Sequence, residues 1–264
     1  MASIKVVING VTGKMGLETL AAVSRESDLE LVGGACKQDR GPTLGTPYST
    51  VIPLSTDLDA ILEQTRPDVL VDFTNAAVAM DAAAKAAARS INIVMGASGF
   101  TEDQLDQLDA MANDNGVGII VAPNFALGAV VLNHLARLAA RFFDYVDIFE
   151  AHHEAKIDAP SGTALAIARA ATEGKGGPFE APQAEKELVP GTRGGDSHGV
   201  VIHSARMPGR MAHHELVFGA LGQTLTIRHD SINRESFMPG VKMAIRHVVK
   251  STGLKVGLDK IVGL

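Results

Sequence analysis

The sequence has very little cysteine and no excess of positive charge, and each shortage excludes a class of protein. Cys36 is the only cysteine in 264 residues, so a disulfide framework is impossible and a thiolate metal cluster is excluded. Acidic residues outnumber basic residues by 30 to 24, giving a formal net charge of −6. This balance argues against a general surface for nucleic acid or for an anionic membrane, so we expect neither partner. An acidic ligand must therefore meet a local basic cluster.

Long hydrophobic runs are also lacking. The most apolar helix candidate, residues 75–90, is interrupted by Asp81, Lys85 and Arg89 and cannot span a bilayer. The opening residues, MASIKVVING, lead into a strand pattern without the apolar core of a signal peptide, and we therefore expect a cytoplasmic protein. The hydrophobic content of 46% is enough for a buried core in one large domain or two smaller ones.

A glycine-rich turn follows the first predicted strand, residues 4–8. Gly10, Gly13 and Gly16 separate this strand from a predicted helix over residues 15–25. The spacing G-x-x-G-x-x-G differs from the commoner G-x-G-x-x-G, but it allows the same roles: a tight turn, a backbone open to pyrophosphate, and close packing of the helix. The alternative is a glycine-rich turn that binds no ligand.

Strands and helices alternate over the first 125 residues. Further strands are predicted at residues 29–36, 69–73, 93–95 and 118–122, and a helix opens at Thr101 with a capping-box residue, Gln104. The alternation predicts an α/β fold with a Rossmann-like, doubly wound parallel sheet. Ligands bind at the carboxyl ends of the strands in such sheets. The candidate ligand loops are therefore residues 72–74, 96–100 and 122–125.

The pattern changes after Phe125. A long helix over residues 130–143 is followed by the strand that carries His152 and by three further strands, which predict a smaller α+β domain with a mixed sheet. These strands are residues 200–206, 214–218 and 223–229, the last two forming a hairpin. They hold His203, His213 and His214, which we expect to be surface or packed histidines without a catalytic role.

The stretch EAHHEAKIDAPSGTAL, from Glu150 to Leu165, gathers the groups best suited to chemistry. Its first part alternates like a strand, so Glu150 shares a face with Val146 and Ile148, and the adjacent His152 and His153 point to opposite sides. Adjacent strand residues cannot easily converge on one ion, so we expect no metal site here.

An Ala-rich helix is predicted to start at Ser161, Gly162 and Thr163. A helix start leaves backbone N–H groups unpaired and is the positive end of the helix dipole, so a carboxylate can bind there, with His153 and Lys156 as additional donors. The alternative is an ordinary capped helix beside a solvated charge cluster.

The run E-x-H-H-x-x-K-x-D-A-P-S-G-T-A resembles the signature of dihydrodipicolinate reductases, nicotinamide-dependent enzymes of bacterial lysine and diaminopimelate synthesis. The resemblance covers nearly the whole chain. It implies reduction of dihydrodipicolinate, or of its 4-hydroxy hydrate, to tetrahydrodipicolinate. It also implies proton transfer by His152 and Lys156, and contacts to the substrate carboxylates by His153, Gly162 and Thr163 with Ser161 nearby.

The glycine loop G-x-x-G-[RK]-M-G is similar to the cofactor loop of the same family. The turn Gly96-Ala97-Ser98-Gly99 departs from the G-T-T-G common in relatives, so a hydroxyl is missing at Ala97. The residues implied to bind the cofactor are Gly10, Val11, Thr12, Gly13, Lys14, Met15, Gly16, Phe73, Gly96, Ala97, Ser98, Ala122, Pro123, Asn124 and Phe125.

Lys37 follows the second strand, where an acidic residue would accept from the ribose of NADH. Many relatives carry Glu here. Lys37, with Arg40 and Lys14, should attract the 2′-phosphate of NADPH, whereas Asp39 could serve a bare ribose. We predict that NADPH is preferred and that NADH is also used. The alternative is that Lys37 is a solvated loop lysine.

The resemblance also implies a discontinuous organisation. Residues 1–124 form a nucleotide-binding domain completed by a C-terminal helix over residues 236–264, and residues 125–235 form a substrate-binding and oligomerisation domain. A homotetramer built through the small sheets is implied. Two other functions stay open at this point, namely another two-domain Rossmann dehydrogenase and a non-catalytic NADP(H) sensor.

Overall fold

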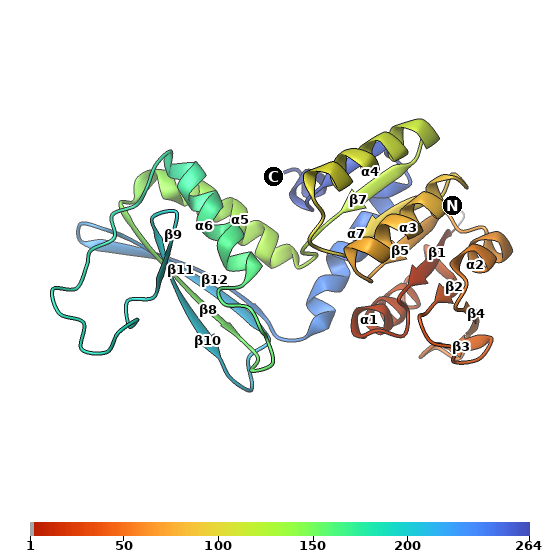
Figure 1. Cartoon of the computed structure of the whole chain (residues 1–264), viewed down its shortest axis with the longest axis horizontal. Helices are drawn as coiled ribbons and strands as arrows, with labels where there is room; N and C mark the ends of the chain where they lie inside the picture. The colour runs from red at the N-terminus through yellow and green to blue at the C-terminus, as the bar shows by residue number, and fades with distance from the viewer. Residues whose placement is uncertain (1–2) are drawn as a thin grey trace. The chain divides into compact units, whose positions relative to one another are not determined.

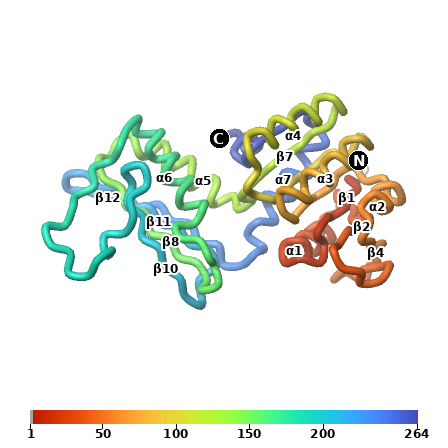
Figure 2. The backbone as a smooth tube through the Cα atoms, in the orientation of Figure 1, coloured from red at the N-terminus to blue at the C-terminus, as the bar shows by residue number. Residues whose placement is uncertain are grey.

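The computed structural model describes residues 3–264, which form two compact units (Figures 1 and 2). Unit 1 contains the described residues up to Phe125 together with Phe237–Gly263. Unit 2 contains Ala126–Ser236 and the single residue Leu264. Unit 1 is therefore built from two segments that are far apart in the sequence, whereas unit 2 is continuous apart from Leu264.

Unit 1 is built around an eight-stranded sheet in the order β13-β7-β6-β5-β1-β2-β4-β3. Every neighbouring pair is parallel except β3 with β4. This arrangement confirms the predicted Rossmann-like parallel sheet. The strands are β1 (Ile4–Asn9), β2 (Leu29–Ala35), β3 (Thr43–Gly45), β4 (Val51–Ser55), β5 (Val69–Asp72), β6 (Asn92–Met95), β7 (Gly118–Val121) and β13 (Gly253–Val256).

The helices of unit 1 bury apolar faces, except α8, which has no buried residue. The helices are α1 (Lys14–Val23), α2 (Leu58–Thr65), α3 (Ala76–Ala87), α4 (Glu102–Asn115), α7 (Met238–Val248) and α8 (Asp259–Val262). Residues of α2, α3 and α4 pack with β1, β5, β6 and β7 in one core. Helix α4 begins with the predicted capping box, because the side chains of Thr101 and Gln104 each accept from the backbone N–H of the other.

The C-terminal segment completes unit 1, but the helix expected over residues 236–264 is wrong, since the segment forms α7, β13 and α8. Gly253 and Gly257, at the two ends of β13, have φ values of +81° and +96°, which a continuous helix does not allow. Strand β13 pairs in parallel with β7 from Gly253 to Val256. Helix α7 lies beside α1, and its Arg246 donates two hydrogen bonds of 2.7 Å to Asp28, which precedes β2. Lys242 donates to Glu26 at 2.6 Å. These ion pairs lower the pKa of both carboxyl groups, so the segment is tied to the first βαβ unit by charge as well as by packing.

Unit 2 is a five-stranded mixed sheet in the order β12-β11-β8-β10-β9, with two helices on one face (Figure 1). Only β8 and β10 are parallel. The predicted smaller domain with a mixed sheet is confirmed, including the hairpin, whose loop is Leu221-Gly222. The elements are α5 (Leu127–Ala139), the 3₁₀ turn η1 (Ala140–Phe142), β8 (Tyr145–His152), α6 (Gly162–Lys175), β9 (Gly195–Ser197), β10 (Val200–Arg206), β11 (Ala212–Ala220) and β12 (Gln223–Ser231).

Strand β8 presents an unusual buried face. Val146 and Ile148 belong to the apolar core beneath α5 and α6, and the next two residues on the same face are Glu150 and His152, which are also buried. Phe149 lies on the opposite face and is 44% exposed. The predicted alternation is therefore correct, and it brings a carboxylate and an imidazole to the end of a hydrophobic core.

Candidate active site

Glu150 and His152 lie together because residues i and i+2 of a strand share a face. The Nδ1 atom of His152 is 2.6 Å from Oε2 of Glu150. The Glu150 side chain has no exposed surface, and that of His152 is 10% exposed. An ionised carboxylate can only accept hydrogen bonds, so Nδ1 carries the hydrogen and Nε2 is left for another partner.

Arg206 holds the same carboxylate from the neighbouring strand. It stands opposite His152 in the parallel pairing of β10 with β8. Its Nη1 and Nη2 donate to the two oxygens of Glu150, each at 2.9 Å, in a bidentate fork. Burial raises the pKa of Glu150, but hydrogen bonds with Arg206, Ser204 and His152 outweigh it and lower the pKa to about 2. Glu150 is therefore ionised at neutral pH.

The start of α6 is attached to the same cluster. The backbone N–H of Ser161 donates to Oε1 of Glu150 at 3.2 Å. The Ser161 hydroxyl accepts from the N–H of Ala164 at 3.1 Å and so caps the helix. Gly162, the first residue of α6, is exposed, and a Cβ atom built on it would have no other atom within 4 Å. The helix start is thus fixed on its buried side and open on the other.

His214 of β11 contacts both Ser161 and His152. Its Nε2 is 3.1 Å from the Ser161 hydroxyl, and its ring meets the His152 ring edge to face, with centroids 5.3 Å apart. Burial lowers the pKa of His214 to about 4, and the charge of His152 adds to the effect. His214 is therefore a packed histidine, as expected, but it is neutral and in contact with two residues predicted to belong to the site.

The charge state of His152 depends on opposing neighbours. Burial lowers its pKa, the hydrogen bond and negative charge of Glu150 raise it, and the positive charges of Lys156 and Arg206 lower it again. His152 is thus a titratable group at the edge of the cluster, between one anion and two cations. This environment suits a proton donor or acceptor.

Lys156 lies in the turn between β8 and α6. Its backbone N–H donates to the carbonyl of His153 at 3.1 Å, and its Nζ donates to Oδ1 of Asp158 at 2.6 Å. The carbonyl of Asp158 in turn accepts from Nη2 of Arg206 at 2.6 Å. The structure therefore connects Lys156, His152 and Ser161 through Arg206 and Glu150. His153 and Thr163 are half-buried at the rim.

In unit 1, the glycine loop has the geometry that its spacing predicts. The N–H groups of Gly10 and Val11 both donate to the carbonyl of Ala35, at 3.0 and 3.1 Å. Gly10 has a φ of +78°, which only glycine adopts readily. A Cβ on Gly16 would lie 2.1 Å from the Gly10 carbonyl oxygen, so Gly16 allows α1 to approach the loop. Thr12, Gly13 and Lys14 are half-buried or exposed at the helix start, and Met15 is half-buried.

The turns after β5 and β6 meet at the carboxyl ends of their strands. The buried Asp72 accepts from the side-chain amide of Asn9 and from the backbone and hydroxyl of Thr74, at 2.7 to 2.9 Å. A Cβ on Gly96 would lie 2.2 Å from the Phe73 ring, and this ring packs edge to face on Phe125 with centroids 5.8 Å apart. These contacts bring the predicted ligand loops together at one end of the sheet.

The other predicted cofactor residues differ in exposure. Ala97 and Ala122 are buried, Ser98 and Pro123 are exposed, and Asn124 is half-buried. Lys37 and Arg40 are exposed after β2. The Asp39 carboxylate accepts from the N–H of Gly41 at 2.9 Å, so one of its oxygens is engaged within its own turn.

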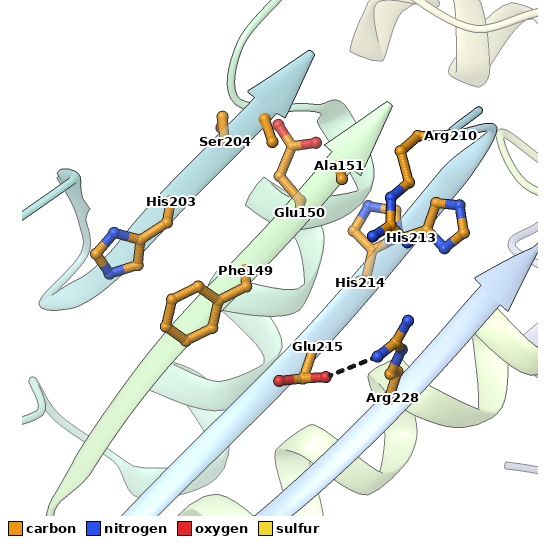
Figure 3. A pocket seen from close by; sticks show the side chains of 11 residues that line it. Phe149, Glu150, Ala151, His203, Ser204, Arg210, His213, His214, Glu215 and Arg228 are labelled. Carbon is orange, nitrogen blue, oxygen red and sulfur yellow. Dashed lines mark hydrogen bonds and ion pairs between the residues drawn. The ribbon is translucent and has the colours of Figure 1, made fainter. Parts of the chain in front are cut away.

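A pocket of 360 Å³ on the sheet of unit 2 was not predicted (Figure 3). Its walls include Phe149, which stacks on the ring of His203 with centroids 4.6 Å apart. Glu215 and Arg228, paired at 3.4 Å, form another wall. Phe149 alternates along β8 with the core residues beneath α5 and α6, so the pocket opens on the sheet face that these helices leave uncovered.

Within residues 3–264, no group of three or more His, Cys, Asp or Glu side chains could hold a metal ion. No helix in the same part of the chain is long and apolar enough to cross a membrane.

Known proteins match this chain over nearly its whole length. The family model for the N-terminus of dihydrodipicolinate reductase matches residues 4–125, and the model for its C-terminus matches residues 128–262. The chain belongs to the dihydrodipicolinate reductase family. Members of this family are NAD(P)H-dependent oxidoreductases.

Individual dihydrodipicolinate reductases are similar from end to end. A 4-hydroxy-tetrahydrodipicolinate reductase of Dehalococcoides mccartyi is 45% identical over 265 residues, covering 100% of both chains. The enzyme of the same name from Bacillus subtilis is 40% identical over 98% of both chains. A dipicolinate-bound dihydrodipicolinate reductase from Paenisporosarcina sp. TG-14 has a TM-score of 0.88 and 38% identity, covering 98% of this chain and 99% of that one.

Three residues of the cluster carried no predicted role. The sequence predicts Glu150 on the same face as Val146 and Ile148. Its spacing of two residues from His152 indicates that the two side chains share a face of the strand. Arg206 and His214 lie 56 and 53 residues from the groups they contact. Only the strand order and register bring them to the site, and neither can be derived from spacing.

The buried His214 should make unit 2 sensitive to acid. Its folded pKa of about 4 lies below the ordinary value of 6.5, so unfolding binds a proton and stability falls as pH drops from about 6.5 to 4. Replacing it by Gln should reduce the loss of unfolding free energy between pH 7 and 4.5 by roughly 2 kcal/mol, measured by urea unfolding at both values. His134→Gln, on the exposed side of α5, is the control. Parallel losses in all three proteins would contradict the prediction.

Proposed function

We propose that this protein is a nicotinamide-dependent 4-hydroxy-tetrahydrodipicolinate reductase, which produces tetrahydrodipicolinate for lysine and diaminopimelate synthesis in the cytoplasm. The observation that carries the proposal is a hydrogen-bond network. The ionised carboxylate of Glu150 binds His152 and Ser161 directly, and it is connected through Arg206 to the turn that carries Lys156. This cluster occurs in a chain that aligns from end to end with relatives of that name.

Proton transfer is assigned to His152 and Lys156. A nicotinamide cofactor, when bound, would supply a hydride. Hydride addition to a conjugated ring would leave an electron-rich enamine that must gain a proton. The Nε2 atom of His152 is available for this task because Nδ1 is bound to Glu150. The Lys156 ammonium, held at 2.6 Å from Asp158, is the second donor.

A substrate carboxylate is assigned to the start of α6. The first turn of this helix contains no acidic residue, and the open space around Gly162 gives a ligand access to the backbone N–H groups. Thr163 and His153 add donors at the rim. Ser161 contributes by capping the helix, because its hydroxyl is already bonded to Ala164 and His214.

The cofactor is assigned to unit 1. The exposed backbone of Gly13 precedes α1, whose first turn also lacks acidic residues, and this arrangement suits a pyrophosphate. Phe73, Gly96, Ser98 and the turn of residues 122–125 would surround the nicotinamide, and the buried Ala97 supplies no hydroxyl. Lys37, exposed after β2, favours the 2′-phosphate of NADPH, with NADH as the weaker alternative.

We assign the subunit contacts of a homotetramer to the face of the unit 2 sheet that α5 and α6 leave uncovered. Phe149 and Tyr145 are 44% and 39% exposed there, beside the 360 Å³ pocket. Large apolar side chains on an open sheet face are commonly covered by a partner, and a second copy of the chain is the partner that we propose.

The activity itself is the first test. The purified protein should oxidise reduced nicotinamide when freshly generated 4-hydroxy-tetrahydrodipicolinate is added, followed by loss of cofactor absorbance. His152→Gln and Lys156→Ala should each lower kcat by about 10²–10⁴-fold, the usual contribution of a general acid, with cofactor affinity unchanged. His134→Gln serves as the control. Variants within threefold of the parent would remove these two residues from the proton step.

Gly162→Ala tests the anion site without disturbing the fold. The added methyl group meets no atom of the chain, and Ala favours a helix over Gly by about 0.5–1 kcal/mol, so stability should be kept or rise slightly. Substrate KM should rise by about tenfold, which corresponds to roughly 1.4 kcal/mol of lost binding. Gly177→Ala, equally open but beyond the end of α6, should change neither quantity. An unchanged KM in Gly162→Ala would place the carboxylate elsewhere.

Lys37→Glu tests the cofactor preference. Loss of a charged contact with the 2′-phosphate, and its replacement by a repulsive one, should lower kcat/KM for NADPH relative to NADH by about tenfold. Raising the salt concentration should shrink the preference of the parent, because exposed charges are screened. Lys250→Glu makes the same charge change at another exposed position of unit 1. Equal effects of Lys37→Glu on both cofactors would show that Lys37 does not contact the 2′ position.

A further inference from the structure

The Glu150 carboxylate accepts hydrogen bonds from three separate parts of unit 2. Oε2 accepts from His152 at 2.6 Å and from Nη1 of Arg206 at 2.9 Å. Oε1 accepts from Nη2 of Arg206 at 2.9 Å and from the N–H of Ser161 at 3.2 Å. The donors come from β8, from β10 and from the start of α6, so this one side chain sets their relative positions.

A buried ion pair often stabilises a protein core less effectively than apolar side chains do. Val146 and Ile148, the preceding residues on the same face of β8, are 3% and 0% exposed, and an apolar residue at position 150 would continue this face. Removing a carboxylate and a guanidinium from water costs several kcal/mol per ion, and a buried pair often gives no net stability over hydrophobic residues of the same volume. Packing alone therefore does not account for Glu150 and Arg206.

We propose that Glu150 and Arg206 are positioning residues for the proton-transfer step, which rests on the function proposed above. Glu150 fixes the His152 ring so that Nε2 is the atom that gives up the proton, and it holds Ser161 so that the start of α6 faces the same substrate. Arg206 keeps the carboxylate in place and, through the carbonyl of Asp158 at 2.6 Å, holds the turn that carries Lys156.

The charges around His152 indicate how the pair acts. The groups that face His152 are Glu150 on its own strand, Lys156 on the following turn, Arg206 on β10 and the neutral His214 on β11. Glu150 raises the pKa of His152, whereas burial, Lys156 and Arg206 lower it. Without the negative charge, the imidazolium would lose its proton at a lower pH and less of the acid form would be present during turnover.

Glu150→Gln removes the charge while keeping the size of the side chain. The pH at which kcat falls on the alkaline side should move down by about 1 unit or more, because an opposite charge at this distance shifts a pKa by roughly 1–3 units. At pH 8, kcat should fall by about 10- to 100-fold, less than the loss in His152→Gln. Glu173→Gln, which removes an exposed glutamate paired with Arg137 at 2.7 Å in the same unit, should leave the pH profile unchanged.

A spectroscopic measurement makes the result independent of activity. Among the nine histidines, the NMR signal of ¹³C-labelled His152 is the one that His152→Gln removes. In Glu150→Gln, this signal should titrate at a lower pH than in the parent. If the unpaired Arg206 prevents folding, the double variant Glu150→Gln/Arg206→Met removes both charges. It should show a smaller downward shift, because Glu150 raises the pKa of His152 by more than Arg206 lowers it.

The outcomes separate the two proposals. If His152→Gln retains full kcat, the proposed proton donor is wrong. If His152→Gln is impaired, but the pH profile and the His152 titration are the same in the parent and in Glu150→Gln, the proton donor stands and the positioning role of Glu150 and Arg206 is overturned.

Discussion

The ion pair between Glu150 and Arg206 is the interaction on which the arrangement of the unit 2 site depends. Both groups are largely withdrawn from water, and loss of either partner would leave the other charge uncompensated at a cost of about 3–5 kcal/mol. The two groups meet because β8 and β10 run parallel in a register that sets Arg206 opposite His152. The site therefore depends on the sheet register. A shift of one residue in the pairing of β10 with β8 would turn Arg206 to the other face of the sheet.

Most of the fold could be predicted from hydrophobic period and turn residues. The buried strands β1, β5 and β7 were found within one or two residues of their ends, and the start of α4 was found from its capping box. Most of the elements that were missed are short or atypical: β3 and β9 have three residues each, β4 contains Pro53, and α8 has four residues. Helix α2 was also missed, although Asp57 caps it. Strand β13 follows a helix at the very end of the chain, and its pairing with β7 is a long-range contact without a local signal.

The candidate site could be predicted only where its residues are close in sequence. The stretch from Glu150 to Thr163 contains the strand end, the turn and the helix start, and local rules describe each of them. Arg206 and His214 come from strands whose order in the sheet, β11-β8-β10, does not follow from their spacing. The charge of Glu150 and the neutrality of His214 depend on these neighbours, so the electrostatics of the site could not be derived from the sequence alone.

The placement of β13 has a consequence for synthesis on the ribosome. Chains grow from the N-terminus, and β7 remains an edge strand with unpaired backbone groups until residues 253–256 have been made. Unit 2, which is continuous from Ala126 to Ser236, is complete before that moment. The unit begun first is thus the last to be finished, and an mRNA truncated near its 3′ end would yield a unit 1 sheet with an open edge prone to pairing with other chains.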